Sequence, residues 1–592
     1  MERMDDNFSC VDAVKRSCSA VDHARKALKF TFTRKERKKC LETVLNAWKD
    51  TINALSRSSS SRFDNRSDCG INNKPDDIPA IALQWTLSLA AFFSQWLLSS
   101  RSREQIDLLG ESGVRTARRL ARCYAPALSP HLLQESILIS DQIRSLSDLS
   151  LSAVIPAFPS GEVRLLLQSD SRERRERAWH ALAARMEEGR NTMANRFVEL
   201  HALRRSIAES AGYRHYGEYA VRRYRLTDAF RTHVPTFRET LRRHITPLIA
   251  PIRALHQKRL ELDSIEPWDL LYPANFGPPR LHMEEESLEK SWINVIRQLL
   301  TTRVPLFEKM ARDGMIKLNV LNAERSPIVF GESPSVLVAP FADPSTLFFA
   351  LSNIPQEYFA HTLFFMSGVL ILDPLAADSV SSELFPVLDH ALSQKDDSKV
   401  SDTATLAASV PPTFLTACVA GYSFSLLSQR AWRHFYGSMS DYAQQYLVTA
   451  FAFELLFLLA LDEMDEFLAN SPVSDAATFE QVWCEIAERY ALPGTDGVSP
   501  GLFPVRDLWF MAPSLLKRPL TGIVKALALV TVLGTLPFGR NHIQLEGYYV
   551  RLLNTHEGRN PLLRLLRSGY PSPFKEETVQ KAAFAIADFL AL

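Results

Sequence analysis

Glycine is scarce in this chain, with 22 residues among 592. That is about half of the ~7% that soluble proteins normally contain. Folds that depend on many tight turns, or on glycine-rich phosphate-binding loops, are therefore disfavoured. A mainly helical body fits the composition better, because glycine weakens helix interiors.

Paired cysteines, net charge and long apolar runs are also in short supply. The seven cysteines contain no C-x-x-C pair, which gives no support for a zinc ribbon or a redox motif. The net charge of +1 gives no reason to expect nucleic acid or an anionic membrane as a partner. The longest apolar stretch, Leu447 to Leu461, is interrupted by Glu454 and is too short to span a bilayer, and the first residues are polar. We therefore expect a cytoplasmic protein that binds neither nucleic acid nor a membrane.

The first 77 residues differ from the rest and are predicted to form a variable N-terminal extension. Apolar residues at helical spacing, including Leu41 and Val44, predict a helix near 36–55. The charge run 34–39 is more typical of a solvated helix start than of a localisation signal. The polar segment that follows, to residue 77, is typical of a flexible linker. A protein partner could bind through this extension.

The remaining chain is predicted to form two helical lobes, 78–310 and 311–592. In the first lobe an apolar stripe that includes Met193, Phe197 and Leu200 predicts a long helix. β-Branched runs predict two or three short strands within 315–341. Helices are expected to resume after Pro344, including 446–467 and 576–590, with a polar loop over 393–412.

Several segments carry motifs of one known family, in that family's order. The segments are Arg205–Tyr213 with His215–Tyr219, Pro267–Pro273, the strands 328–341 with Asp343–Leu347, Phe451–Leu455 and Tyr548–Leu592. Together they resemble the oligoendopeptidase F branch of the thimet-oligopeptidase-like zinc metallopeptidases over roughly residues 165–592. The resemblance implies a mainly α, two-lobed helical shell around a deep channel that accepts peptides, with a small β-sheet beside the zinc helix.

The family implies a zinc helix carrying H-E-x-x-H, but these 592 residues contain no such motif. Two registers are possible for the degenerate helix. One places the ligand histidines at Phe349 and Asn353. The other places them at Gln356 and Ala360 and keeps the catalytic glutamate as Glu357. We prefer the first because it preserves the distance to the third-ligand motif, where Ala376 replaces the ligand glutamate.

The residues that stabilise the oxyanion in the family are also replaced. The family segment with one histidine and several tyrosines aligns with 513–526, where the histidine is Ser514 and two of the tyrosines are Thr521 and Lys525. We therefore expect no catalytic residues of the family, no zinc and no other cofactor. Zinc-dependent peptide hydrolysis is not expected.

A relocated metal site is a weaker alternative. Glu357 and His361 are four residues apart on one predicted helix face, and Glu383 could approach from the next helix. Ordinary polar residues lining a cleft explain the same pattern. The sequence thus predicts a pseudo-peptidase that binds a peptide-like or small-molecule ligand. The alternatives are a metal-free enzyme of different chemistry, such as a biosynthetic tailoring step, and a regulatory or scaffold partner.

Overall fold

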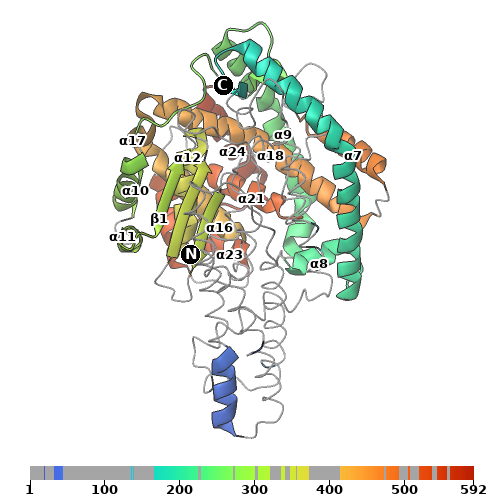
Figure 1. The fold of residues 1–592 in the computed structure, drawn as a ribbon, viewed down its shortest axis with the longest axis vertical. Coiled ribbons are helices and arrows are strands. Elements are labelled where there is room, and N and C mark those ends of the chain that lie inside the picture. The colour runs from blue at the N-terminus through green and yellow to red at the C-terminus, as the bar shows by residue number, and fades with distance from the viewer. Residues whose placement is uncertain are drawn as a thin grey trace, which may run out of the picture.

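The structure is a computed structural model of the chain. It describes residues 33–44, 166–223, 228–270, 274–283, 285–300, 304–320, 335–340, 347–354, 356–372, 414–471, 475–492, 519–536, 543–555 and 560–592, with a few single residues between them. The architecture is mainly helical, as the glycine content predicted. In Figure 1 the long helix α7 follows one edge of the molecule and a small sheet lies at the opposite edge.

The first half of the described chain is a series of helices: α7 (Arg172–Ser210), α8 (Tyr216–Arg223), α9 (Asp228–Leu260), the short η3 (Pro267–Asp269), α10 (Glu285–Leu299) and α11 (Val304–Arg312). Helix α7 begins at Ser171, whose side chain accepts a hydrogen bond from the Arg174 amide. Its predicted stripe is confirmed, because Met193, Phe197 and Leu200 are buried. The predicted lobe boundary at 310/311 lies near the end of α11 and stays a prediction.

A three-stranded sheet follows, formed by β1 (Ile316–Val320), β2 (Ser335–Pro340) and β3 (Leu347–Ile354) in the order β1-β3-β2. Strand β3 is parallel to β1 and antiparallel to β2. The first two strands confirm the prediction for 315–341, but β3 was expected to be helical. Phe349 is fully buried in β3, pairs with Ile316 and packs against Trp292 with ring centroids 5.0 Å apart.

The preferred register for the zinc helix is therefore wrong. Phe349 and Asn353 lie on strand β3, where successive side chains point to opposite faces of the sheet. Residues four apart on a strand are about 13 Å apart along the chain, so they do not reproduce the one-turn spacing of H-E-x-x-H. The helix begins later, at Gln356, which is where the second register places it.

The second half of the described chain is helical as well. Helices α18 and α24 confirm the predicted helices at 446–467 and 576–590. The elements are α12 (Gln356–Leu372), α16 (Phe414–Ser428), η5 (Gln429–Ala431), α17 (Arg433–Tyr436), η6 (Gly437–Met439), α18 (Ser440–Asn470), α19 (Ala476–Arg489), α21 (Gly522–Leu533), α22 (Ile543–Asn554), α23 (Pro561–Arg567) and α24 (Glu576–Leu590).

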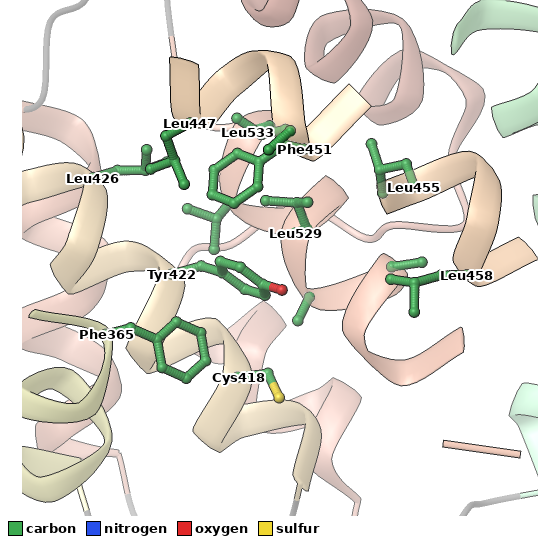
Figure 2. Close-up of a cluster of buried hydrophobic side chains, with 14 of the residues drawn as sticks. Phe365, Cys418, Tyr422, Leu426, Leu447, Phe451, Leu455, Leu458, Leu529 and Leu533 are labelled. Atoms are coloured by element: carbon green, nitrogen blue, oxygen red, sulfur yellow. The ribbon is translucent and has the colours of Figure 1, made fainter. Parts of the chain in front are cut away.

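Helices α12 and α16 form the centre of the core and are buried on all sides. Two glycines allow them to approach closely. A Cβ at Gly368 would lie 2.5 Å from the carbonyl oxygen of Ala420, and one at Gly421 would lie 2.6 Å from the Phe365 ring. Figure 2 shows how side chains of α12, α16, α18 and α21 meet in this core, with Phe365 and Tyr422 beside each other.

The described part of the N-terminal extension is a short helix over 34–44. Thr33 and Glu36 cap it, since the Glu36 amide donates to Thr33 Oγ1 and the Thr33 hydroxyl donates to Glu36. Leu41 and Val44 are buried and residues 34–39 are exposed, which confirms a solvated helix start. The predicted linker and the predicted polar loop at 393–412 lie outside the described residues. No helix in the described residues is long and apolar enough to cross a membrane.

Candidate functional site

The first turn of α12 holds three of the predicted site positions, Gln356, Glu357 and Ala360. Gln356 Oε1 accepts a hydrogen bond of 3.0 Å from the Leu281 amide. Glu357 Oε1 accepts one of 2.8 Å from Gln168 Nε2. Both bonds come from the first half of the chain, so residues of the predicted first lobe hold the beginning of this helix.

A tyrosine hydroxyl is inserted into the same turn. The Tyr436 hydroxyl donates to the Gln356 carbonyl oxygen at 2.8 Å and accepts from the Ala360 amide at 3.3 Å. It thus bridges a carbonyl and an amide that are four residues apart, the pair that a regular α-helix joins directly. Burial raises the pKa of Tyr436 above its ordinary value, so the hydroxyl stays protonated and able to donate.

This donor set does not fit a zinc ion. Zinc sites in enzymes use three protein ligands drawn from histidine, cysteine and carboxylate side chains. Here one histidine position is a carboxamide whose oxygen already accepts a backbone hydrogen bond, and the other, Ala360, carries only a methyl group. Among the residues that the structure describes, no group of three or more His, Cys, Asp or Glu side chains could hold a metal ion.

The relocated metal site is only partly covered by the structure. Glu357 and His361 both lie on α12 and are 3% and 2% exposed, but their described hydrogen bonds go to different partners, Gln168 and Ser425. Glu383, the third predicted ligand, lies outside the described residues, as do Ala376 and Ser514. The site with Glu383 stays a prediction.

His361 is held in a fixed orientation within an aromatic pocket. Its Nδ1 lies 2.7 Å from Ser425 Oγ. Its ring lies 5.5–6.3 Å from the rings of Phe365, Tyr422 and Phe451, all three labelled in Figure 2. Burial, assisted by the charge of Lys525, lowers the pKa of His361 to about 3. The imidazole is therefore neutral near pH 7.

Two charged side chains share this apolar region with His361. Lys525 lies on α21 and is 8% exposed, and Glu454 lies on α18 and is 6% exposed. The charge of Lys525 acts on both His361 and Glu454. Burial raises the pKa of Glu454, and the nearby lysine opposes part of that rise. The structure thus brings together two predicted positions, His361 and Lys525, while the buried Thr521 precedes Lys525 by one turn.

Glu454 was missed as a member of this cluster. The sequence carried a usable signal, because Glu454 is the one charged residue in the apolar run Leu447 to Leu461. A charged residue inside such a run needs a partner in the folded core. The pattern alone could not say that the partner would come from α21.

A second polar network fixes the turn that precedes α7, and it too was missed. Asp269 is fully buried and accepts hydrogen bonds from Arg172 (2.9 Å), Arg175 (2.8 Å) and the Glu266 amide (3.0 Å). Burial alone would raise the pKa of Asp269, but the bonds from Arg172 and Arg175 lower it on balance. The Arg175 guanidinium also lies over the Tyr272 ring, 4.3 Å from its centroid.

The same network holds the turn that presents Gln168. Arg175 Nη1 donates to the carbonyl oxygens of Ser169 at 2.8 Å and Asp170 at 3.3 Å. The Tyr272 hydroxyl donates to Asp170 Oδ1 at 2.8 Å. Asp269 and Tyr272, two residues of the motif, therefore have a structural role that the sequence resemblance did not reveal: they anchor the turn that contacts Glu357.

Comparisons with known proteins agree with the overall fold. The sequence model of peptidase family M3 matches residues 165–290. The solved structure titled "PZ peptidase A with inhibitor 2" is similar over 98% of this chain and 97% of its own, with a TM-score of 0.71 and 15% identity. The oligoendopeptidase F of Enterococcus faecium is similar over 100% and 98%, with a TM-score of 0.59 and 11% identity. No curated protein matches the chain in sequence at a significant level. The chain thus matches peptidase family M3 over residues 165–290 and has the helical fold of oligoendopeptidase F.

Proposed function

We propose that this protein is a pseudo-peptidase that binds a peptide-like or small-molecule ligand without hydrolysing it. The observation that carries the proposal is the donor set in the first turn of α12. Gln356 and Ala360 stand where two zinc ligands are required, and the Gln356 oxygen is already engaged with the Leu281 amide. Glu357, at the position of the catalytic glutamate, accepts a hydrogen bond from Gln168.

The buried lysine supports the same conclusion. Lys525 replaces a tyrosine of the family's oxyanion segment and places a cation close enough to lower the pKa of His361. An ammonium group has no lone pair to offer a metal ion, so this replacement supplies no zinc ligand.

The fold supports a peptide-like ligand. The structural relatives are named as peptidases, and one was solved with an inhibitor. A helical shell that has lost its metal ligands keeps the features that bind a chain, because backbone recognition does not require the metal. We therefore propose that the ligand binds in the deep channel that the family resemblance implies between the two predicted lobes.

Two measurements on the purified protein test the proposal. Cleavage of a mixture of fluorogenic peptides should be absent with and without added zinc, and the same peptides should bind in a fluorescence anisotropy assay. Hydrolysis that appears with zinc and disappears with a chelator would refute the proposal. The double variant Gln356→His with Ala360→His restores H-E-x-x-H on α12 and is the matched control for the loss of the two ligand histidines.

A metal-free enzyme is the second candidate, favoured by the buried cluster of His361, Lys525 and Glu454. The cluster holds a neutral imidazole oriented by Ser425, a lysine and a carboxyl group. These are residue types that transfer protons in enzymes. Under this alternative the compounds that co-purify with the protein would be chemically altered during incubation. The alteration would stop in the variant His361→Gln. Recovery of unchanged compounds would exclude it.

A further inference from the structure

The hydrogen bond between Gln168 and Glu357 joins two segments that are 189 residues apart in sequence. Gln168 is partly exposed, whereas Glu357 is only 3% exposed. The bond places a side-chain carboxamide on the carboxylate at the first turn of α12. This is the only family catalytic position that keeps its residue type in the second register.

A carboxamide is a small chemical equivalent of a peptide bond. Its N–H group donates to Glu357 at 2.8 Å, in the range of hydrogen bonds to charged acceptors. A buried carboxylate oxygen that loses a donor without replacement is strongly destabilised. A ligand can therefore replace Gln168 without this loss when it brings its own hydrogen-bond donor. Backbone amides and amines satisfy this condition, and carbonyl or ether oxygens do not.

The backbone next to Gln168 is held in place during such an exchange. Arg175 binds the carbonyl oxygens of Ser169 and Asp170, and Tyr272 binds the Asp170 carboxylate. Rotation of the Gln168 side chain is then sufficient to release Glu357, with no rearrangement of the turn. The Gln168 side chain can thus occupy and release the Glu357 carboxylate reversibly, and we call this contact the plug.

We propose that Glu357 is the anchoring group for an N–H donor of the ligand, a peptide amide or an amine, and that Gln168 occupies this position in the free protein. The inference rests on the proposed function and deepens it. It assigns a binding role to the retained glutamate, names the class of ligand group that it accepts, and identifies an autoinhibitory contact within the chain.

The test uses the full chain and, as the probe, a penta-alanine amide with a fluorescent label at its N-terminus. The variant Gln168→Leu keeps the side-chain size but removes the donor. We expect it to bind the probe about tenfold more tightly than the wild-type protein, because a competing hydrogen bond to a charged group has been removed. The N-methylated form of the same peptide, which lacks backbone N–H groups, should show no gain.

A matched control exists on the surface of α19. Gln481 Nε2 donates to Glu485 Oε1 at 3.0 Å, which is the same pair of groups in an exposed position. The variant Gln481→Leu should bind the probe as the wild-type protein does. The variant Glu357→Leu, which removes the acceptor, should lose the gain when combined with Gln168→Leu, and circular dichroism melts establish that each variant is folded.

The inference and the proposed function fail on different results. If Gln168→Leu does not bind penta-alanine amide more tightly than wild type, or if the N-methylated peptide gains equally, the plug does not exist and the inference is overturned. The proposed function is overturned instead by zinc-dependent, chelator-sensitive hydrolysis in the wild-type protein, whatever Gln168→Leu does.

Discussion

Replacing Asp269 with alanine should destabilise the protein severely. Its carboxylate is fully buried and accepts bonds from two guanidinium groups and one backbone amide. Removing one member of a buried charge network costs about 3–5 kcal/mol, because the remaining charges lose their partner away from water. Asp269→Ala should fall at the upper end of this range, since both arginines and the Glu266 amide lose an acceptor.

Alanine substitution of the two arginines should lower the free energy of unfolding by different amounts. Arg175 is 3% exposed and also binds two carbonyl oxygens, so Arg175→Ala should cost about 3–5 kcal/mol. The Arg172 side chain is 41% exposed, and Arg172→Ala should cost about 1 kcal/mol or less because water screens its charge. Urea unfolding followed by circular dichroism gives both free energies. Equal losses for the two variants would refute the burial argument.

Acid should remove the stabilisation that the Asp269 carboxylate gives to the folded protein. Its pKa is lower in the folded protein than in the unfolded chain, so its contribution to stability is complete above the unfolded pKa. That contribution is lost as the pH falls through the folded pKa. The difference in unfolding free energy between wild type and Asp269→Asn should therefore shrink below about pH 4. A difference that stays constant between pH 7 and pH 3 would contradict the assigned charge state.

Three further outcomes follow from the core. Gly368→Val should lower the free energy of unfolding by at least about 1–3 kcal/mol, because a Cβ there lies 2.5 Å from a backbone carbonyl oxygen of α16. Gly547→Ala should be neutral or stabilising, because the nearest atom to its Cβ lies at 3.5 Å. Thermal melts of both variants measure the difference. In the wild-type protein the free energy of unfolding should fall as the pH drops from 6.5 to about 3, because the unfolded histidine binds a proton there and the folded one does not. His361→Gln should reduce this slope by up to about 1.4 kcal/mol per pH unit. An unchanged slope in urea titrations would exclude a buried neutral imidazole. Lys525→Met should raise the pKa of Glu454 further, because the nearby lysine opposes the rise that burial causes; an unchanged Glu454 pKa in NMR titrations of the side-chain carboxyl group would show that the two groups are not coupled.

The sequence predicted most helices correctly, and it failed at the central strand of the sheet. The stripe of Met193, Phe197 and Leu200 marks one face of α7, so a helical period was visible. Strand β3 has the sequence LFFALSNI and lies between two other strands. A central strand in which apolar residues follow one another does not show the alternation that identifies strands. Its period cannot be distinguished from that of a buried helix.

The site was predicted in part, for a related reason. The second register placed Gln356, Glu357 and Ala360 on the correct helix, and the choice against it relied on sequence distance to Ala376, which loops can change freely. The contacts that define the site join distant segments. Gln168 and Glu357 are 189 residues apart, and no spacing rule relates them. Lys525 was noticed only as a lost tyrosine, although its position beside His361 gives it a role of its own.

The mutual burial of α12 and α16 also has a consequence during synthesis. Each helix is apolar around its whole circumference, so neither has a polar face to turn toward water before the other is present. Ribosomes add roughly 5–20 residues per second. For several seconds the newly made α12 is therefore an uncovered apolar segment, until α16 emerges and Gly368 and Gly421 allow the two to meet. Nascent chains stopped between these helices should require a chaperone to remain unaggregated, and chains that include α16 should not.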